Sequence, residues 1–88
     1  MFDKNYHCYS EQFGECLLSI KSYGTDMFYK IVKKGLTLFE TSTNLTTPIY
    51  DQIKMIEENG KIVMSSFTPM KIGNKFYKTI IFTKMGII

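Results

Sequence analysis

The sequence contains no arginine, no alanine and no tryptophan, although it has eleven lysines. Arginine is the side chain that binds carboxylates and phosphates through two parallel hydrogen bonds from one planar group. Its absence excludes chemistry that needs an arginine finger, and it excludes the commonest bidentate contact to guanine. All the positive charge comes from lysine, which binds anions as a flexible point charge.

Catalytic signatures are also missing. The sequence has no P-loop, no dinucleotide fingerprint and no glycine-rich stretch that would hold a phosphate. His7 is the only histidine, and its neighbour Cys8 would point to the opposite face of a strand. The acidic pair Glu57 and Glu58 would diverge around a helix and is expected to be solvated. We therefore expect neither an enzyme nor a cofactor.

Cys8 and Cys16 are the only cysteines. With His7 they offer three soft metal ligands, whereas a structural zinc site needs four at short spacings. Glu11 or Glu15 would have to supply the fourth. The simpler interpretation is two reduced thiols buried in the core, so no metal is expected.

The length of 88 residues predicts a single domain over residues 1–88. An apolar content of 44% and an aromatic content of 15% favour a folded globule. No apolar run approaches the ~20 residues of a membrane helix, and residues 1–6 do not resemble a secretory signal, so a cytoplasmic location is expected. Phe, Tyr, Ile, Met, Asn and Lys fill about half of the chain. This bias is typical of AT-rich coding and favours a small phage or mobile-element protein, which would act in the host cytoplasm.

Charge is distributed unevenly along the chain. Residues 1–60 carry six lysines and eight acids, whereas residues 61–88 carry five lysines and no acid. A segment of this kind is expected to face a negative partner. The alternative is that its lysines keep strand edges soluble.

Three short runs in the first half predict an antiparallel meander. They are rich in aromatic and β-branched residues and are separated by Gly24-Thr25-Asp26 and by Gly35. The expected strands cover residues 16–23, 27–34 and 36–42. Residues 1–13 favour an irregular or helical lead-in, because three rings recur at helical spacing, although residues 5–10 also fit a strand.

A helix is expected over residues 48–58. Thr47 would cap it, and Pro48 would occupy its first turn at no cost. Asn59-Gly60 would end it in a left-handed conformation. One apolar stripe recurs at helical spacing and would lie on the sheet: Ile49, Ile53 and Ile56.

The last third predicts a β-hairpin with arms at residues 61–67 and 75–84 and Gly73-Asn74 at its tip. Pro69 cannot donate to a ladder, so the first arm should be an edge strand or contain a bulge there. The expected fold is α+β, a sheet of about five antiparallel strands with the helix packed on one face.

The final arm has two different faces. One carries Phe76, Lys78, Ile80, Phe82 and Lys84, and the other carries Tyr77, Thr79, Ile81 and Thr83. One face must meet the core, which would leave the other as a contact surface. Alternatively, the strand is buried on both sides in a small barrel.

Two non-enzymatic functions fit these features. The first is a phage-type inhibitor or adaptor that binds a host protein through an exposed face of aromatic and lysine residues or through an added edge strand. The second is binding of RNA or single-stranded nucleic acid through the basic hairpin. No membrane partner is expected, and an exposed edge would permit a homodimer. The candidate contact residues are Tyr29, Lys30, Lys71, Lys75, Phe76, Tyr77, Lys78, Phe82 and Lys84.

Overall fold

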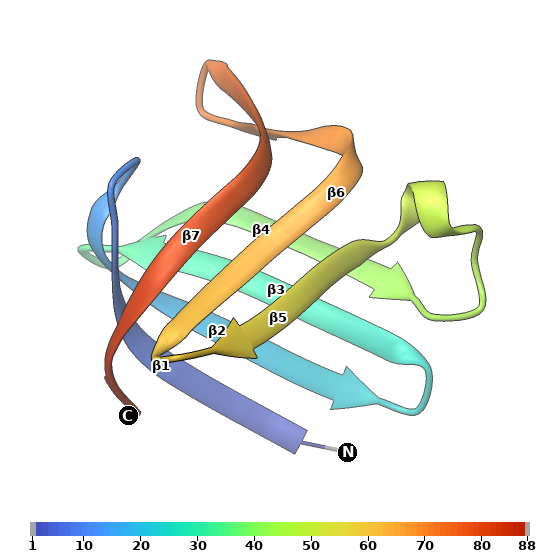
Figure 1. The fold of residues 1–88 in the computed structure, drawn as a ribbon, viewed down its shortest axis with the longest axis horizontal. Coiled ribbons are helices and arrows are strands. Elements are labelled where there is room, and N and C mark those ends of the chain that lie inside the picture. The colour runs from blue at the N-terminus through green and yellow to red at the C-terminus, as the bar shows by residue number, and fades with distance from the viewer. Residues whose placement is uncertain (1, 88) are drawn as a thin grey trace.

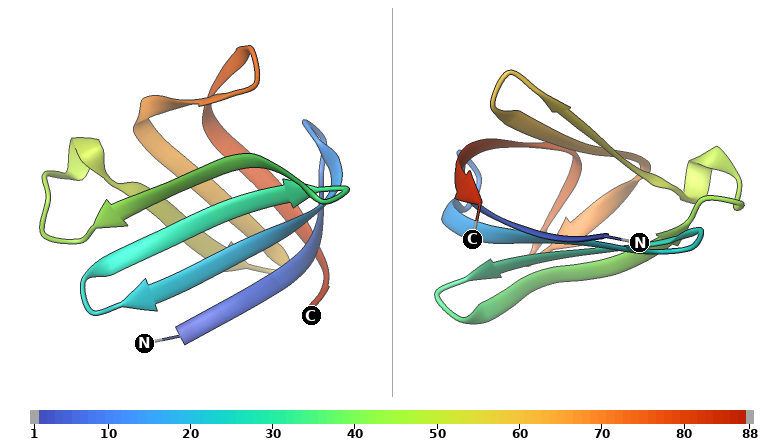
Figure 2. Two further views of the ribbon diagram at one scale, coloured as in Figure 1. Left: turned by 180° about the vertical axis from the view of Figure 1, so that it is seen from behind. Right: turned by 90° about the horizontal axis from the view of Figure 1, so that it is seen from below.

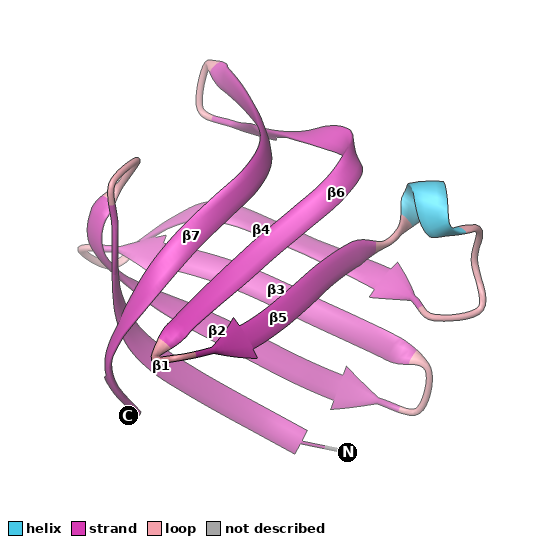
Figure 3. Cartoon of the chain, viewed as in Figure 1, coloured by secondary structure: helices cyan, strands magenta, loops and turns pink. Residues whose placement is uncertain are grey.

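The computed structural model describes residues 2–87, which form one curled antiparallel sheet and a single short 3-10 turn (Figures 1 and 3). The α+β prediction is wrong, because no α-helix occurs in the described part of the chain. No helix there is long and apolar enough to cross a membrane. In chain order the elements are β1 Phe2–Ser10, β2 Gly14–Tyr23, β3 Asp26–Lys33, β4 Leu36–Asn44, η1 Ile49–Asp51, β5 Ile53–Glu58, β6 Lys61–Ile72 and β7 Lys75–Ile87.

The strands lie in the order β4-β3-β2-β1-β7-β6-β5, and every neighbouring pair is antiparallel. Figure 2 shows the sheet curling into two facing layers, with β1 at the bend. Because seven strands alternate in direction, the two end strands β4 and β5 have the same polarity. Pairing them directly would need a crossover of about a dozen residues or more. The link over residues 45–52 is shorter than that, so the sheet stays open as a half-barrel with two free edges.

The expected helix is a strand. Only Ile49–Asp51 form a helical turn, and residues 53–58 are β5. Asn59 and Gly60 have φ angles of 51° and 75°, which make a two-residue turn between β5 and β6 rather than a helix end. Asn-Gly is the strongest short-range signal for a hairpin. Ile53 and Ile56 consequently point to opposite faces, and Ile56 is 54% exposed.

The other predictions of strands and turns agree better with the structure. The three expected strands correspond to β2, β3 and β4, and Gly73-Asn74 connects β6 to β7 as predicted. The bulge expected near Pro69 is confirmed, since the β6–β7 register shifts between Ser65 and Met70. The prediction of an irregular or helical segment before Gly14 is wrong. Residues 2–10 are β1, and a short loop ending at Gly14 with a φ of 77° turns them into β2.

The core fills the space between the two layers. Alternate residues of the strands point inward, as expected for a half-barrel whose outer face is exposed to solvent. On β7 the inward residues are Ile80 and Phe82, so this strand is not buried on both sides. The buried apolar residues are Tyr6, Cys8, Cys16, Leu18, Ile20, Tyr29, Ile31, Ile62, Met64, Met70, Ile72, Ile80 and Phe82.

Candidate functional site: a basic aromatic surface

The nine candidate contact residues divide between the interior and the surface. Tyr29 and Phe82 belong to the buried core. Lys84 lies on the inner face, where it pairs with a carboxylate, and Lys30 pairs with Glu40 on the outer face of the other layer at 3.8 Å. Tyr77 is half-buried and packs edge-on against Phe13. The remaining four are on the β6–β7 hairpin: Lys71, Lys75, Phe76 and Lys78. Lys75 lies opposite buried Ile72, so it is on the other face of the hairpin from Lys71 and Phe76.

Two further rings lie beside this hairpin. Tyr50, on η1, and Phe67, in the β6 bulge, have their ring centroids 5.1 Å apart. The hydroxyl of Thr68 donates to the Tyr50 carbonyl oxygen at 3.3 Å, which ties the bulge to the 3-10 turn. We use the name basic aromatic surface for Tyr50, Phe67, Lys71, Phe76 and Lys78.

Hollows flank the Tyr50–Phe67 pair on both sides. One, of about 400 Å³, lies between β4 and β6 and includes Tyr50 and Lys71 in its lining. The other, of about 340 Å³, lies on the outer face of β5, β6 and β7 and includes Phe67 and Lys78. Tyr50 thus borders one hollow, together with Lys71 and the acidic Asp51, and Phe67 borders the other, together with Lys54 and Lys78. A flat aromatic or planar group could enter from either side.

The lysines of the β6–β7 hairpin are unpaired, although Asp51 lines the same hollow as Lys71. Within residues 2–87, no carboxylate lies within ion-pair distance of Lys71, Lys75 or Lys78. The Lys71 ammonium instead lies 5.9 Å from the centre of the Phe76 ring, a cation–π arrangement. Phe76 is 67% exposed and Tyr50 is 65% exposed, so both rings are open to a ligand.

Sequence patterns could not identify Tyr50 and Phe67 as members of this surface. Tyr50 fell inside the expected helix, and Phe67 ended an expected strand. The two rings meet only because the β6 bulge projects Phe67 toward the turn that carries Tyr50. The relevant signal in the sequence was Pro69. It predicted a bulge, but it could not predict that the bulge lies beside the turn that carries Tyr50.

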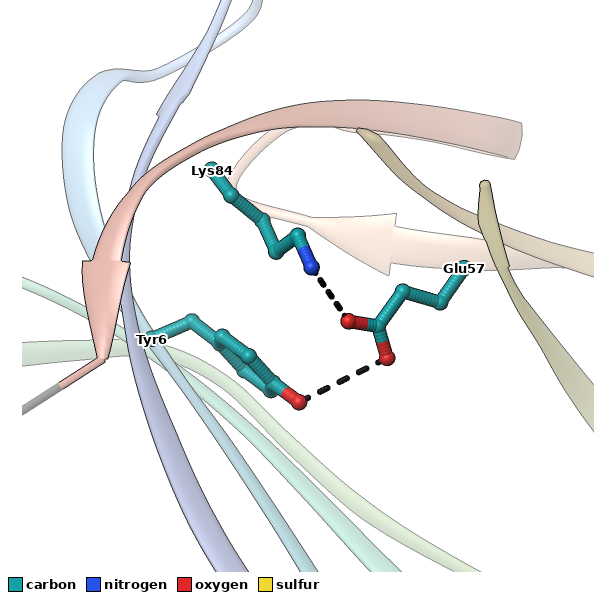
Figure 4. Close-up of polar contacts among 3 residues, drawn as sticks. All are labelled: Tyr6, Glu57 and Lys84. Carbon is teal, nitrogen blue, oxygen red and sulfur yellow. Dashed lines mark hydrogen bonds and ion pairs between the residues drawn. The ribbon is translucent and has the colours of Figure 1, made fainter. Parts of the chain in front are cut away.

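A separate cluster of three polar side chains lies between the two layers of the sheet (Figure 4). The Lys84 ammonium, from β7, donates to Glu57 Oε1, from β5. The Tyr6 hydroxyl, from β1, donates to Glu57 Oε2 at 3.5 Å. The Lys84 hydrogen bond, assisted by its charge, holds the pKa of Glu57 below its ordinary value and raises that of Lys84. Because Lys84 is already paired with Glu57, its ammonium group is not free to bind a ligand.

The Glu57 ion pair should make stability depend on pH. A carboxyl whose folded pKa is lowered stabilises the fold above its unfolded pKa, and this stabilisation disappears as pH falls through the folded pKa. At pH 7, Glu57→Gln should lower the free energy of unfolding by about 0.5 kcal/mol, because the pair is partly exposed. At low pH, below the folded pKa of Glu57, the two proteins should have equal stability. Urea unfolding at both pH values measures this, and an unchanged difference at low pH would contradict it.

The two cysteines face each other inside the sheet. Cys8 and Cys16 are directly opposite on β1 and β2, and both are buried and unpaired, as the sequence predicted. Burial, together with the neighbouring Cys16, raises the pKa of the Cys8 thiol to about 11 against an opposing effect of Lys84. Burial also raises the pKa of Cys16. His7 is on the outer face near Glu15, so the three soft donors do not converge, and the described residues contain no metal-binding group of His, Cys, Asp or Glu.

Comparison of this chain with protein-family models, with curated proteins and with solved structures gave no match. Its function is therefore inferred from the chemistry of its own surface.

Proposed function

We propose that the protein is a non-enzymatic binding protein that holds single-stranded nucleic acid, RNA above all, on the basic aromatic surface. The observation that carries this proposal is the grouping of two lysines without ion-pair partners, Lys71 and Lys78, with three exposed rings. Of the two functions expected from the sequence, it favours the one assigned to the basic hairpin. The other expected function used one face of β7 to contact a host protein. That face points largely inward, with Phe82 in the core.

The surface offers the two interactions that single strands need. Exposed rings stack on bases regardless of sequence, and each such contact contributes about 1–3 kcal/mol. Lys71 and Lys78 are positioned to neutralise phosphates next to stacked bases. Because the chain has no arginine, it lacks the commonest base-specific contact, and little sequence preference is expected.

The test is the salt dependence of binding to a fluorescent single-stranded RNA, measured by anisotropy. The variant Lys71→Gln/Lys78→Gln should reduce the slope of log K against log salt by about 1.4, because it removes two phosphate contacts from a single strand. A control with the same charge change away from this surface, Lys21→Gln/Lys33→Gln, should keep the wild-type slope. An equal loss of slope in both double variants, or no binding by the wild type at low salt, would contradict the proposal.

A protein partner is the second candidate, as for a phage-type inhibitor or adaptor of a host protein. The observation that favours it is the free edge of β4, which has exposed Leu36 at its start and exposed Leu45 directly after it. A partner could add a strand there. Affinity purification from the native host with nuclease separates the two functions. One stoichiometric protein that survives nuclease supports the second candidate, and recovery of nucleic acid alone counts against it.

A further inference from the structure

The second free edge, β5, has features of a self-association site. It is the last strand of the sheet and pairs only with β6. Most of its residues are exposed, including all three on its outer face: Lys54, Ile56 and Glu58. An edge of this kind presents unpaired backbone donors and acceptors to any strand that can align with it.

The hairpin geometry determines which backbone groups are free. The two-residue Asn59-Gly60 turn makes Glu58 and Lys61 a hydrogen-bonded pair. Alternation along the ladder then points the N–H and C=O groups of Ile53, Met55 and Glu57 away from β6. One contact in the structure agrees with this assignment, since the Ile53 carbonyl accepts a hydrogen bond from the Tyr29 hydroxyl at 3.4 Å. The free groups of Met55 and Glu57 remain for an added strand.

We propose that two copies of this chain pair through β5 as antiparallel strands, with Ile56 opposite Ile56 of the second copy. In this register Lys54 faces Glu58 of the second copy, and Glu58 faces its Lys54. Met55 and Glu57 then lie opposite each other across the interface and exchange about four interchain hydrogen bonds. A two-fold axis through Ile56 generates both halves of this contact, as an isologous dimer requires.

Charge selects this register over its neighbours. Shifting the two-fold axis to Met55 would place Lys54 against Ile56, which leaves both lysines unpaired. Shifting it to Glu57 would place two glutamates directly opposite each other, an unfavourable cross-strand pair. Within residues 2–87 neither Lys54 nor Glu58 has an ion-pair partner, so both charges are available to the second copy.

An apolar row also continues across the proposed interface. On the outer face, Ile56 lies opposite Val63, and Val63 lies opposite Ile81 on β7. Ile56 and Ile81 are both exposed, so the row is an uncovered apolar strip in the single copy. In the dimer the two rows would join through Ile56 at the centre of one continuous sheet. These features favour a second copy of the chain as the occupant of this edge.

Sedimentation equilibrium of the purified full chain, without nucleic acid, tests the pairing. The wild type should be a dimer at about 100 µM. Lys54→Glu and, separately, Glu58→Lys should each raise the dimer dissociation constant by roughly 10- to 100-fold, because each replaces two opposite-charge pairs by two like-charge pairs. The double swap Lys54→Glu/Glu58→Lys should restore the wild-type constant. Lys21→Glu, the same charge change on β2, should leave it unchanged.

Circular dichroism of every variant confirms that each is folded. A monomeric wild type at this concentration would overturn the proposal. A dimer that tolerates both single swaps would also overturn it, and so would a double swap that stays monomeric. The pairing is independent of the proposed nucleic-acid binding, because no ligand enters the measurement.

Discussion

Phe82→Ala should lower the free energy of unfolding by about 3–5 kcal/mol, the usual cost of removing a fully buried ring. Phe82 is 0% exposed and lies opposite Ile62 on β6 and Ser10 on β1, both of which are also buried. Its ring therefore fills the interior where β1, β7 and β6 meet. A domain of this size has a total stability of about 5–10 kcal/mol, so the variant should be close to unfolding. Urea denaturation followed by circular dichroism measures the loss.

Phe76→Ala is the matched control, since it removes the same ring from the same strand at an exposed position. It should change the free energy of unfolding by less than about 0.5 kcal/mol. Its effect should fall on RNA affinity, with a loss of about 5- to 100-fold from one stacked base. Equal destabilisation by Phe82→Ala and Phe76→Ala would contradict the placement of Phe82 in the core and of Phe76 on the surface.

Both thiols should resist modification in the folded protein. Cys8 and Cys16 are buried, and burial raises the pKa of both, that of Cys8 to about 11. Because the thiolate is the reactive form, the raised pKa alone should slow the reaction of Cys8 with a disulfide reagent about 100-fold at pH 8. Lack of access slows it further. Urea above the unfolding midpoint should release both thiols.

An exposed cysteine provides the comparison for this measurement. Thr83→Cys adds a thiol on the outer face of β7, where the side chain is exposed. That thiol should react at the rate of the unfolded chain while the other two remain protected. Rapid modification of Cys8 and Cys16 in native wild-type protein would contradict their placement between the two layers.

The local signals in the sequence predicted most strands but not their assembly. Turn dipeptides located the β2–β3 and β6–β7 connections because their chemistry is local. The helix prediction failed because Asn59-Gly60, a strong hairpin signal, was interpreted as the end of a helix that begins at Thr47-Pro48. Ile49, Ile53 and Ile56 fit a helical stripe, whereas the inward alternation of Ile53 and Met55 spans too few residues to compete. The β1–β7 pairing joins the two ends of the chain and has no local signature.

The site was predictable only where it depends on one hairpin. Lys71, Phe76 and Lys78 lie on one hairpin because β6 and β7 are neighbours in sequence and in space. On β7 the strict alternation of faces breaks, since Tyr77 and Ile80 both contact the core. This change coincides with the β6–β7 register shift. A pattern with period two therefore grouped exposed Phe76 with buried Phe82.

The most direct test of the proposed function is amide chemical-shift mapping during titration with a single-stranded RNA. Binding at the basic aromatic surface should shift the signals of Tyr50 and Phe67 and those of the β6–β7 hairpin from Lys71 to Lys78. Signals from the outer face of β2 and β3, including Ser19 and Lys30, should stay in place. Shifts concentrated on β2 and β3, or no shifts at low salt, would contradict the assignment of this surface to nucleic-acid binding.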